Sequence, residues 1–315
     1  MLINEINTVL KFNGSLGIVL GSGLDHIVDL LNDKIIIPYS KIDSFPSSTV
    51  DGHKGELISG YFLEKQILIA RGRLHLYEGI KKEEVIMPIQ LFHELGVKNI
   101  IITNSSGSLR LDNKPGSLML IDGHYDCTFL DSSKLPDLKE GDKYYNENLV
   151  KLAFIVAKKN NIELLKGKYC WMHGPAYETP AEIQFLQKLG GDAVGMSTLP
   201  EVEAAKKNKM STLVLSVLTN YAAGLDNKTL RHEDVLLNAK KAQKNFIKLV
   251  KNIILDMKTY PKNGQLLIMK LLKIKILLKK KLVMSFLKEC KLLYIIQEKI
   301  LSLIHISEPT RPERI

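Results

Sequence analysis

Leu16-Gly17-Ile18-Val19-Leu20-Gly21-Ser22-Gly23 is the stretch that decides the fold, because an apolar run ends there in a short glycine loop. The pattern predicts a buried strand over Leu16–Leu20 and a helix that opens after Gly21–Leu24. Glycines let backbone N–H groups approach an anion, and a helix N-terminus favours negative charge. The loop is no dinucleotide fingerprint, since His26 stands at the third glycine position, and it lacks the GK[ST] of a Walker A loop. An anion site and a plain tight turn both remain open.

The alternation of apolar runs and helical patterns continues to about residue 256, without an internal repeat or a clear linker. This order predicts an α/β fold with a central, largely parallel or mixed sheet flanked by helices. The predicted strands are Leu16–Leu20, Ile35–Ile37, Gln66–Arg71, Asn99–Thr103, Leu118–Ile121, Lys168–Met172, Ala193–Gly195 and Thr212–Thr219. The predicted helices are 81–95, 146–160, 180–189, 200–208 and 231–256.

The net charge of +10 comes from the end of the chain. Residues 258–315 hold 13 of the 44 Lys and Arg residues but 4 of the 34 Asp and Glu residues, so the rest carries +1. This near-neutral body disfavours a general nucleic-acid-binding domain. The Leu/Ile/Lys-rich composition of 263–300 is typical of A/T-rich DNA read out of frame, and 301–311 resembles a translated sequencing adapter. We expect one domain over 1–257 and a non-native tail over 258–315.

The cysteines favour a reducing compartment, because Cys127, Cys170 and Cys290 are odd in number and form no CxxC. The first residues lack the blocks of a signal peptide, and no stretch has 18 uncharged apolar residues. We therefore expect a cytoplasmic protein that binds neither membrane nor nucleic acid. The competing hypothesis is a non-catalytic protein that binds a membrane surface or nucleic acid through its basic tail. Deletion of 258–315 separates the two.

Arg73-Leu74-His75-Leu76-Tyr77 places three functional side chains at alternate positions of a segment predicted to be extended, so they share one face. A guanidinium and an imidazole on one face suit an oxyanion better than a core. A structural salt bridge for Arg73 is the alternative. Thr103–Gly107 ends another apolar strand, and its turn either offers N–H groups to the same anion or only caps the strand. His53, between glycines, belongs either to a lid or to the surface.

His173–Pro180 follows a predicted strand and carries Tyr177, an aromatic face, and Glu178, a carboxylate that can accept from ring N–H groups. Thr179 also fits the cap of a helix with Pro180 at its first position, and both interpretations can hold. Asn220 ends the apolar run 212–218. Its amide presents a donor and an acceptor together, which suits a purine N7 and O6, with Thr219 beside it.

Gly195–Glu201 joins a predicted strand to a helix. Met196 can pack on a sugar ring and Ser197 can donate to phosphate, although a core methionine and a capping serine are the alternatives. His232, at the start of the last predicted helix, is an exposed cap unless a ligand reaches it. All these phrases follow predicted strands, where ligands bind in open α/β sheets.

Eight phrases in this order resemble the trimeric, low-molecular-mass class of purine nucleoside phosphorylases, over about residues 14–256. They are GSGL, GHKG, RLHLYEG, TNSSG, GPAYETPAEI, GMSTLPE, TNYAAG and HEDVL. The resemblance implies a mixed, partly barrel-like sheet, a homotrimer, and phosphorolysis of 6-oxopurine (deoxy)ribonucleosides in purine salvage. Inorganic phosphate would be a co-substrate, with no metal or organic cofactor.

The resemblance also implies a role for each matched residue. Catalysis would fall to Asn220, Glu178, His75 and His232. Phosphate would be held by Ser22, His53, Arg73, His75, the Ser105 backbone and Ser197. Ribose would lie against Tyr77, Met196 and His232. The base would lie among Tyr177, Glu178, Thr219 and Asn220.

Three departures from the family pattern bear on activity. Ser105 and Ser106 replace the usual alanines, which a backbone contact tolerates, and both the Asp-His-Ile-Asn phrase and the NPLxG loop are missing from 122–145. The family places an aromatic of a neighbouring subunit over the sugar near this region, for which Tyr144 or Tyr145 could substitute. Two alternatives stay open: a methylthioadenosine phosphorylase, which Asn220 disfavours, and a nucleoside-binding homologue with weak turnover.

Overall fold

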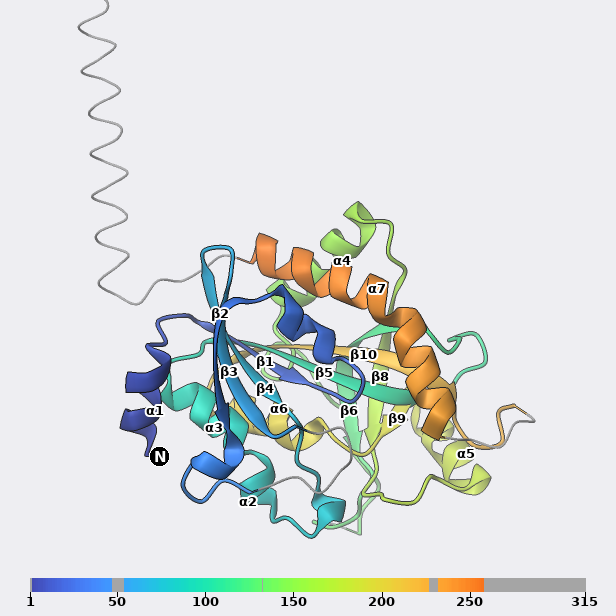
Figure 1. Ribbon diagram of the computed structural model, residues 1–315. Helices are drawn as coiled ribbons and strands as arrows, with labels where there is room; N and C mark the ends of the chain where they lie inside the picture. Colours follow the sequence, from blue (N-terminus) through green and yellow to red (C-terminus); the bar gives the residue numbers. More distant parts are fainter. Residues whose placement is uncertain (1, 47–53, 132, 227–231, 258–315) are drawn as a thin grey trace, which may run out of the picture. The chain divides into compact units, whose positions relative to one another are not determined.

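The structure, a computed structural model, describes residues 2–46, 54–131, 133–226 and 232–257, without the side chains of 232–236 and 239 (Figure 1). Its strands form one mixed sheet. They are β1 (Leu16–Leu20), β2 (Asn32–Pro38), β3 (Glu56–Phe62), β4 (Lys65–Arg71), β5 (Asn99–Ser108), β6 (Leu118–Asp126), β7 (Lys139–Glu140), β8 (Leu164–Trp171), β9 (Ala193–Gly195) and β10 (Ser211–Tyr221).

The helices of the described residues lie between and beyond these strands. They are α1 (Ile3–Leu10), α2 (Lys82–Val85), α3 (Met87–Glu94), α4 (Glu147–Lys159), α5 (Pro180–Leu189), α6 (Leu199–Lys207) and α7 (His232–Asp256). Three 3₁₀ helices join them: η1 (Asp25–Leu30), η2 (Tyr39–Lys41) and η3 (Leu76–Glu78).

The sheet closes on itself. Its strand order is β10-β6-β8-β9-β5-β1-β4-β3-β2, and β10 also pairs with β5, so that five strands form a barrel from which β1, β4, β3 and β2 extend. The β5–β10, β6–β8 and β8–β9 pairs are parallel, whereas β6–β10 and β5–β9 are antiparallel. The prediction of an α/β fold with a mixed, partly barrel-like sheet is confirmed.

The strand β5 is shared between the barrel and its extension. Its first half pairs with β1 over Asn99–Ile102, and its end pairs with β9 at Gly107 and Ser108. Between these two pairings, neither β1 nor β9 pairs with residues 103–106 as a strand neighbour, although the Thr103 side chain donates to the carbonyl of Val19. The sheet therefore forks there, beside the loop that follows β1. A change of neighbours at strand ends is where α/β sheets bind ligands.

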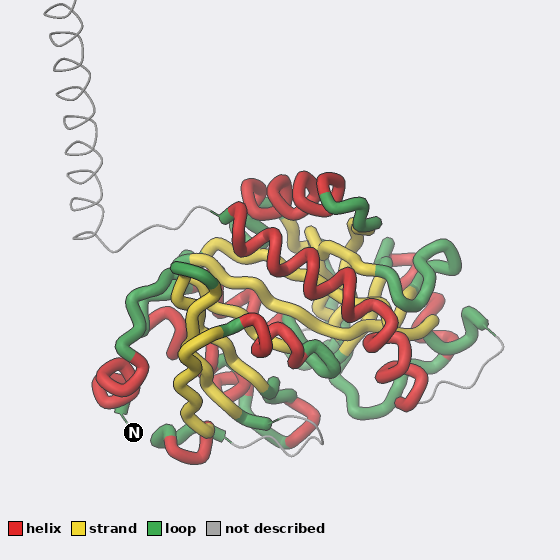
Figure 2. The backbone as a smooth tube through the Cα atoms, turned by 45° about the horizontal axis from the view of Figure 1, so that its top comes forward, coloured by secondary structure: helices red, strands yellow, loops and turns green. Residues whose placement is uncertain are grey.

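Helices cover both sides of the sheet. On one side α7 crosses the strands and packs against β10 and α4 (Figure 2). Its buried residues recur at helical spacing, which makes one apolar face: Ala242, Phe246, Leu249, Val250, Ile253 and Ile254. On the other side α6 contacts α3, β5 and β10.

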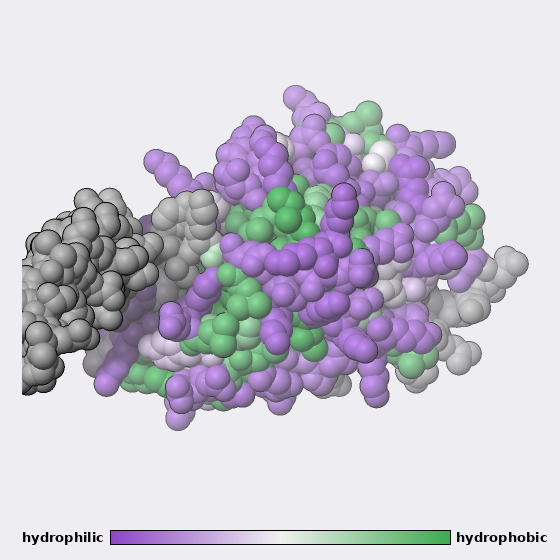
Figure 3. Space-filling view, turned by 90° about the horizontal axis from the view of Figure 1, so that it is seen from above, coloured by the Kyte–Doolittle hydropathy of each residue, from purple (hydrophilic) through white to green (hydrophobic). Residues whose placement is uncertain are grey.

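The outer face over α4 and α7 is mainly hydrophilic, with small apolar clusters between (Figure 3). Exposed lysines such as Lys151, Lys158 and Lys251 contribute to this polar surface. No helix in the described part of the chain is long and apolar enough to cross a membrane.

Several sequence predictions of secondary structure are wrong in detail, and both α1 and β7 were not predicted. The helix expected over 81–95 is broken at Ile86 into α2 and α3, because Pro88 cannot donate to the carbonyl of Glu84 and its ring crowds that carbonyl. The glycine loop after β1 leads into the 3₁₀ helix η1 rather than an α-helix. The strand β3 was missed, since its Ser59 and Gly60 interrupt the apolar pattern.

Candidate active site

A cavity of about 290 Å³ lies at the fork of the sheet. Arg73 and Asn220, which the sequence analysis placed at opposite ends of one substrate, both line it. The predicted site residues that line it are Ser22, Arg73, His75, Tyr77, Ser105, Tyr177, Glu178, Met196, Ser197, Thr219 and Asn220. His53 lies outside the described residues. Of His232 the backbone alone is described, as the first residue of α7.

The glycine loop after β1 is held in place by the side chains of β5. The N–H of Gly21 donates to Thr103 Oγ1 at 3.1 Å, and Ser105 Oγ donates to the carbonyl of Ser22 at 2.9 Å. A Cβ at Gly21 would stand 2.7 Å from the Cα of Asn104, so this close approach needs glycine. The loop is thus fixed against β5 at the edge of the cavity.

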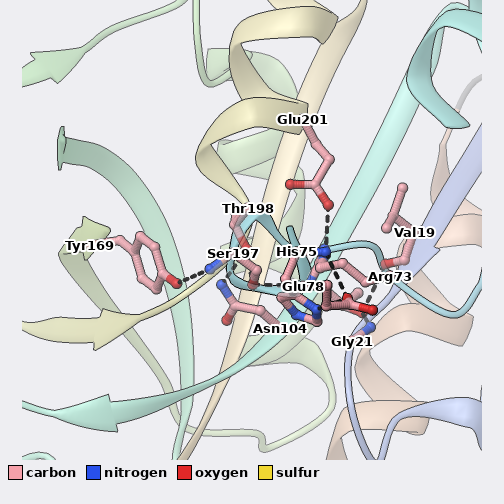
Figure 4. Close-up of polar contacts among 11 residues, drawn as sticks. Val19, Gly21, Arg73, His75, Glu78, Asn104, Tyr169, Ser197, Thr198 and Glu201 are labelled. Atoms are coloured by element: carbon pink, nitrogen blue, oxygen red, sulfur yellow. Dashed lines mark hydrogen bonds and ion pairs between the residues drawn. The ribbon is translucent and has the colours of Figure 1, made fainter. Parts of the chain in front are cut away.

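Arg73 forms a buried ion pair and lines the cavity at the same time (Figure 4). Its Nε donates to Glu201 Oε1 at 2.6 Å, and both side chains are 3% exposed. Its Nη1 donates to Ser197 Oγ at 3.3 Å. The structural salt bridge of Arg73 is therefore present, and it fixes one edge of a guanidinium that also lines the cavity.

His75 and Tyr77 stand beside Arg73. His75 has extended backbone angles, and its Nδ1 lies 3.0 Å from Glu78 Oε1. Its ring stacks on Tyr77 with centroids 4.6 Å apart and planes at 18°. The segment was expected to stay extended through Tyr77, but it does not, because η3 begins at Leu76. Both rings still line the cavity, and burial raises the pKa of Tyr77 to about 12.

The residues that lead into α6 form another wall of the cavity, to which Gly195, Met196 and Ser197 contribute (Figure 4). Asn104 Nδ2 donates to Thr198 Oγ1 at 2.8 Å, and this hydroxyl lies 3.2 Å from Ser197 Oγ. Thr198, whose backbone φ is 81°, stands at the N-cap of α6, but its hydroxyl makes no capping bond to the helix. Met196 lines the cavity one residue before Ser197. Because Thr198 holds the N-cap position, Ser197 is not the capping serine that the sequence allowed as an alternative.

At the other end of the cavity the amide of Asn220 is fixed by its neighbours. Thr219 Oγ1 donates to Asn220 Oδ1 at 2.9 Å, and Asn220 Nδ2 donates to the carbonyl of Tyr221 at 3.0 Å. An amide has two N–H donors and an oxygen with two lone pairs. Each of these bonds uses one donor or one lone pair, so that one donor and one acceptor of Asn220 have no partner among the described residues.

Glu178 and Tyr177 complete this end. Glu178 is buried, and burial raises the pKa of its carboxyl above the usual range, an effect that a backbone hydrogen bond opposes and the nearby Glu182 carboxylate reinforces. Tyr177 is 47% exposed at the mouth of the cavity. Thr179 caps α5 by accepting from the Glu182 N–H, as the alternative interpretation of this phrase predicts.

Neither Tyr144 nor Tyr145 is placed to substitute for the aromatic residue that the family positions over the sugar of a neighbouring subunit. Both are buried within their own chain, at 5% and 3% exposure. Tyr145 OH lies 2.6 Å from His124 Nδ1, and Tyr144 OH accepts from Lys206 at 2.9 Å. The altered 122–145 segment therefore keeps these two rings in the core.

Residues outside the predicted set hold the site from behind. Glu201 and Glu78 hydrogen-bond Arg73 and His75, and Thr103 holds the glycine loop. Glu78 and Glu201 stand inside the phrases RLHLYEG and GMSTLPE, so their position close to the site was visible. Their contacts were not. Among the described residues, no group of three or more His, Cys, Asp or Glu side chains could hold a metal ion.

Comparison with known proteins agrees with this geometry. Residues 15–255 match the family model described as "Phosphorylase superfamily". The chain is 38% identical to purine nucleoside phosphorylase 1 of Bacillus subtilis (strain 168), over 76% of this chain and 91% of that protein. The purine nucleoside phosphorylase of Mus musculus is 32% identical, over 81% of this chain and 92% of its own length.

A solved structure gives the same result for the fold. The Schistosoma mansoni purine nucleoside phosphorylase in complex with inosine superimposes with a TM-score of 0.72 at 30% identity, and the match covers 81% of this chain and 95% of that chain. The chain belongs to the purine nucleoside phosphorylase family.

Proposed function

We propose that the chain cleaves 6-oxopurine ribonucleosides and deoxyribonucleosides with inorganic phosphate, giving the free base and (deoxy)ribose 1-phosphate for purine salvage. One observation carries the proposal: Arg73 and Asn220 line the same cavity. Its volume of about 290 Å³ lies close to the lower end of the range usual for small-molecule sites. Relatives at 38% and 32% identity are named for this activity.

The two ends of the cavity suit the two charges of the reaction. Cleavage of the C1′–N9 bond leaves positive charge on the sugar and negative charge on the purine. Phosphate held by Arg73, His75, Ser22, the Ser105 backbone and Ser197 would stabilise the sugar cation and then capture it at C1′. His53 would close over the phosphate.

The base end would stabilise the leaving purine. Asn220, with its free donor and acceptor, would pair with N7 and O6, and Glu178 would accept from a ring N–H. Thr219 would fix Asn220 and Tyr177 would pack on the base. Ribose would lie against Tyr77 and Met196, with His232 at its 5′-hydroxyl. Removal of one preorganised donor of this kind costs about 3–4 kcal/mol of transition-state stabilisation.

The wider setting follows from the same family. We place the enzyme in the cytoplasm, which the buried free thiols of Cys127 and Cys170 support, and assign it no cofactor and no nucleic-acid or membrane partner. We propose a homotrimer, because Phe129, Leu130 and Leu135 are 47–71% exposed and would be covered by a second copy. We also propose that residues 1–257 form the working domain.

The test is release of hypoxanthine from inosine with and without phosphate, by the chain and by its Arg73→Ala and Asn220→Ala variants. Turnover that requires phosphate, survives deletion of 258–315 and falls at least about 100-fold in each variant supports the proposal. Cleavage of methylthioadenosine in preference to inosine would favour the related phosphorylase. Inosine binding without turnover would leave a nucleoside-binding homologue.

A further inference from the structure

Glu201 is a buried carboxylate that lies outside the cavity. It stands in the first turn of α6 and is 2% exposed. Arg73 and Ser197 line the cavity, whereas Glu201 does not, so the guanidinium separates the carboxylate from any bound ligand (Figure 4). Glu201 cannot touch substrate from this place.

The contact between Glu201 and Arg73 fixes the guanidinium by one edge. Oε1 of Glu201 accepts from Arg73 Nε at 2.6 Å, a short, charge-assisted bond. The guanidinium is planar and rigid, so a bond to Nε sets the direction of both Nη groups. Nη1 then points at Ser197 Oγ, 3.3 Å away, on the cavity wall.

Stability alone does not account for this carboxylate. A buried ion pair is often no more stabilising than an apolar pair of the same volume, because both charges lose their hydration. Among the described residues Glu201 has one hydrogen-bond partner, Arg73, and its Oε2 has none. The pair therefore carries a desolvation cost, and in return it both balances the buried charge of Arg73 and fixes the orientation of its guanidinium.

Glu201 is itself held in place by the start of α6. Thr198, at the N-cap, receives a 2.8 Å bond from Asn104 of β5, and its carbonyl accepts from the N–H of Val202. The α6 turn is thus tied to the strand that also holds the glycine loop. The fixed place of Glu201 in this turn brings its carboxylate to Arg73 Nε.

We infer that Glu201 is a positioning residue that sets the affinity for phosphate by aiming Arg73 into the cavity. The inference rests on the proposed function of Arg73 as a phosphate ligand. Two properties of Glu201 can be separated: its reach, which is the length of its side chain, and the charge of its carboxylate. We assign the effect on phosphate affinity to the reach.

Two variants of Glu201 separate these properties. Glu201→Asp keeps the charge but withdraws the oxygens by about 1.5 Å, one carbon–carbon bond, beyond hydrogen-bonding distance of Nε. Glu201→Gln keeps the reach and an accepting oxygen but removes the charge. The matched control is Glu203→Asp, two residues along α6, which shortens a half-buried carboxylate that pairs with Lys139 and Lys206 away from the cavity.

We expect Glu201→Asp to raise the KM for phosphate about tenfold or more while the KM for inosine stays within about twofold, since a misplacement near 1 Å is that costly. Glu201→Gln, whose amide oxygen can still accept from Nε, and Glu203→Asp should leave the phosphate KM within about threefold of the original. An unchanged phosphate KM in Glu201→Asp, an equal rise of both KM values, or a larger effect in Glu201→Gln overturns the inference.

A second measurement covers the case in which Glu201→Asp does not fold. The rise of the melting temperature with phosphate concentration reports phosphate binding directly. In Glu201→Gln an unreduced rise supports the assignment to reach, and its loss contradicts it. An unsubstituted chain without phosphate-dependent turnover would instead overturn the proposed function, so the two failures are distinguishable.

Discussion

Gly107 of β5 lies directly opposite Asn220 of β10, and a Cβ at Gly107 would stand 3.1 Å from Asn220 Nδ2. The same Cβ would lie 3.3 Å from a methyl carbon of Val194. Few real contacts are this short, so the absent side chain leaves the space in which the amide of Asn220 sits. The backbone of β5 therefore sets the base end of the cavity.

Gly107→Ala should push Asn220 out of place and leave the phosphate end intact. We expect kcat/KM for inosine to fall about tenfold, because small displacements of a reacting group are costly. The KM for phosphate, measured at saturating inosine, is the internal control and should stay within about twofold. Equal kcat/KM for inosine in both chains would show that Gly107 does not set the position of Asn220.

Asn220→Asp should shift activity from inosine towards adenosine. The carboxylate can accept from a 6-amino group but can no longer donate to a 6-oxo group, and a site built around one hydrogen bond discriminates by ~10⁴ or more. The ratio of kcat/KM for the two nucleosides measures the shift. The control is Asn208→Asp, at the end of α6, which should leave the ratio unchanged; an unchanged ratio in Asn220→Asp itself would refute the assignment.

Glu178→Gln should stabilise the fold at neutral pH while it weakens base binding. Burial raises the pKa of Glu178, so between the unfolded and folded pKa values the native state binds more protons than the unfolded chain. The stability cost of burying the charged Glu178 carboxylate is therefore absent below the unfolded pKa of about 4.3 and fully present above the folded pKa. Thermal unfolding across pH should show the variant more stable at pH 7 and equal at low pH. A variant that is less stable at pH 7 would contradict this.

Lys65→Met should destabilise the end of α7. Lys65 Nζ donates to the carbonyls of Ile254, Leu255 and Met257, the last turn of the helix, where cations are favourable. We expect the free energy of unfolding to fall by about 1 kcal/mol, since the site is partly exposed. Lys244→Met, an exposed lysine in the interior of α7, is the matched control in urea unfolding. Equal losses in both variants would count against the cap.

Much of the fold could be predicted, because several of its strands, such as β1 and β4, are buried on both faces and appear as continuous apolar runs. The runs at Leu16–Leu20 and Ala193–Gly195 coincide with β1 and β9. The closure of the barrel could not be derived from the residues alone. It depends on β5 pairing with both β9 and β10, a non-local arrangement that came instead from the family resemblance.

The site could be predicted as a set of residues but not as a set of contacts. Polar groups that follow strand ends meet at one edge of a sheet, which brought Arg73 and Asn220 to one cavity. Glu201 was missed because no local pattern connects it with Arg73 across 128 residues. Tyr144 and Tyr145 were named as substitutes for the aromatic over the sugar because the burial of a tyrosine in a changed loop has no sequence signal.

The most direct test of the account is the fate of the sugar. Inosine and phosphate are incubated with the full chain, and the products are followed by ³¹P NMR together with hypoxanthine release. The account predicts ribose 1-phosphate in equal amount to hypoxanthine, with no free ribose. Free ribose with an unchanged phosphate signal would contradict it, because water rather than phosphate would then lie beside the anomeric carbon.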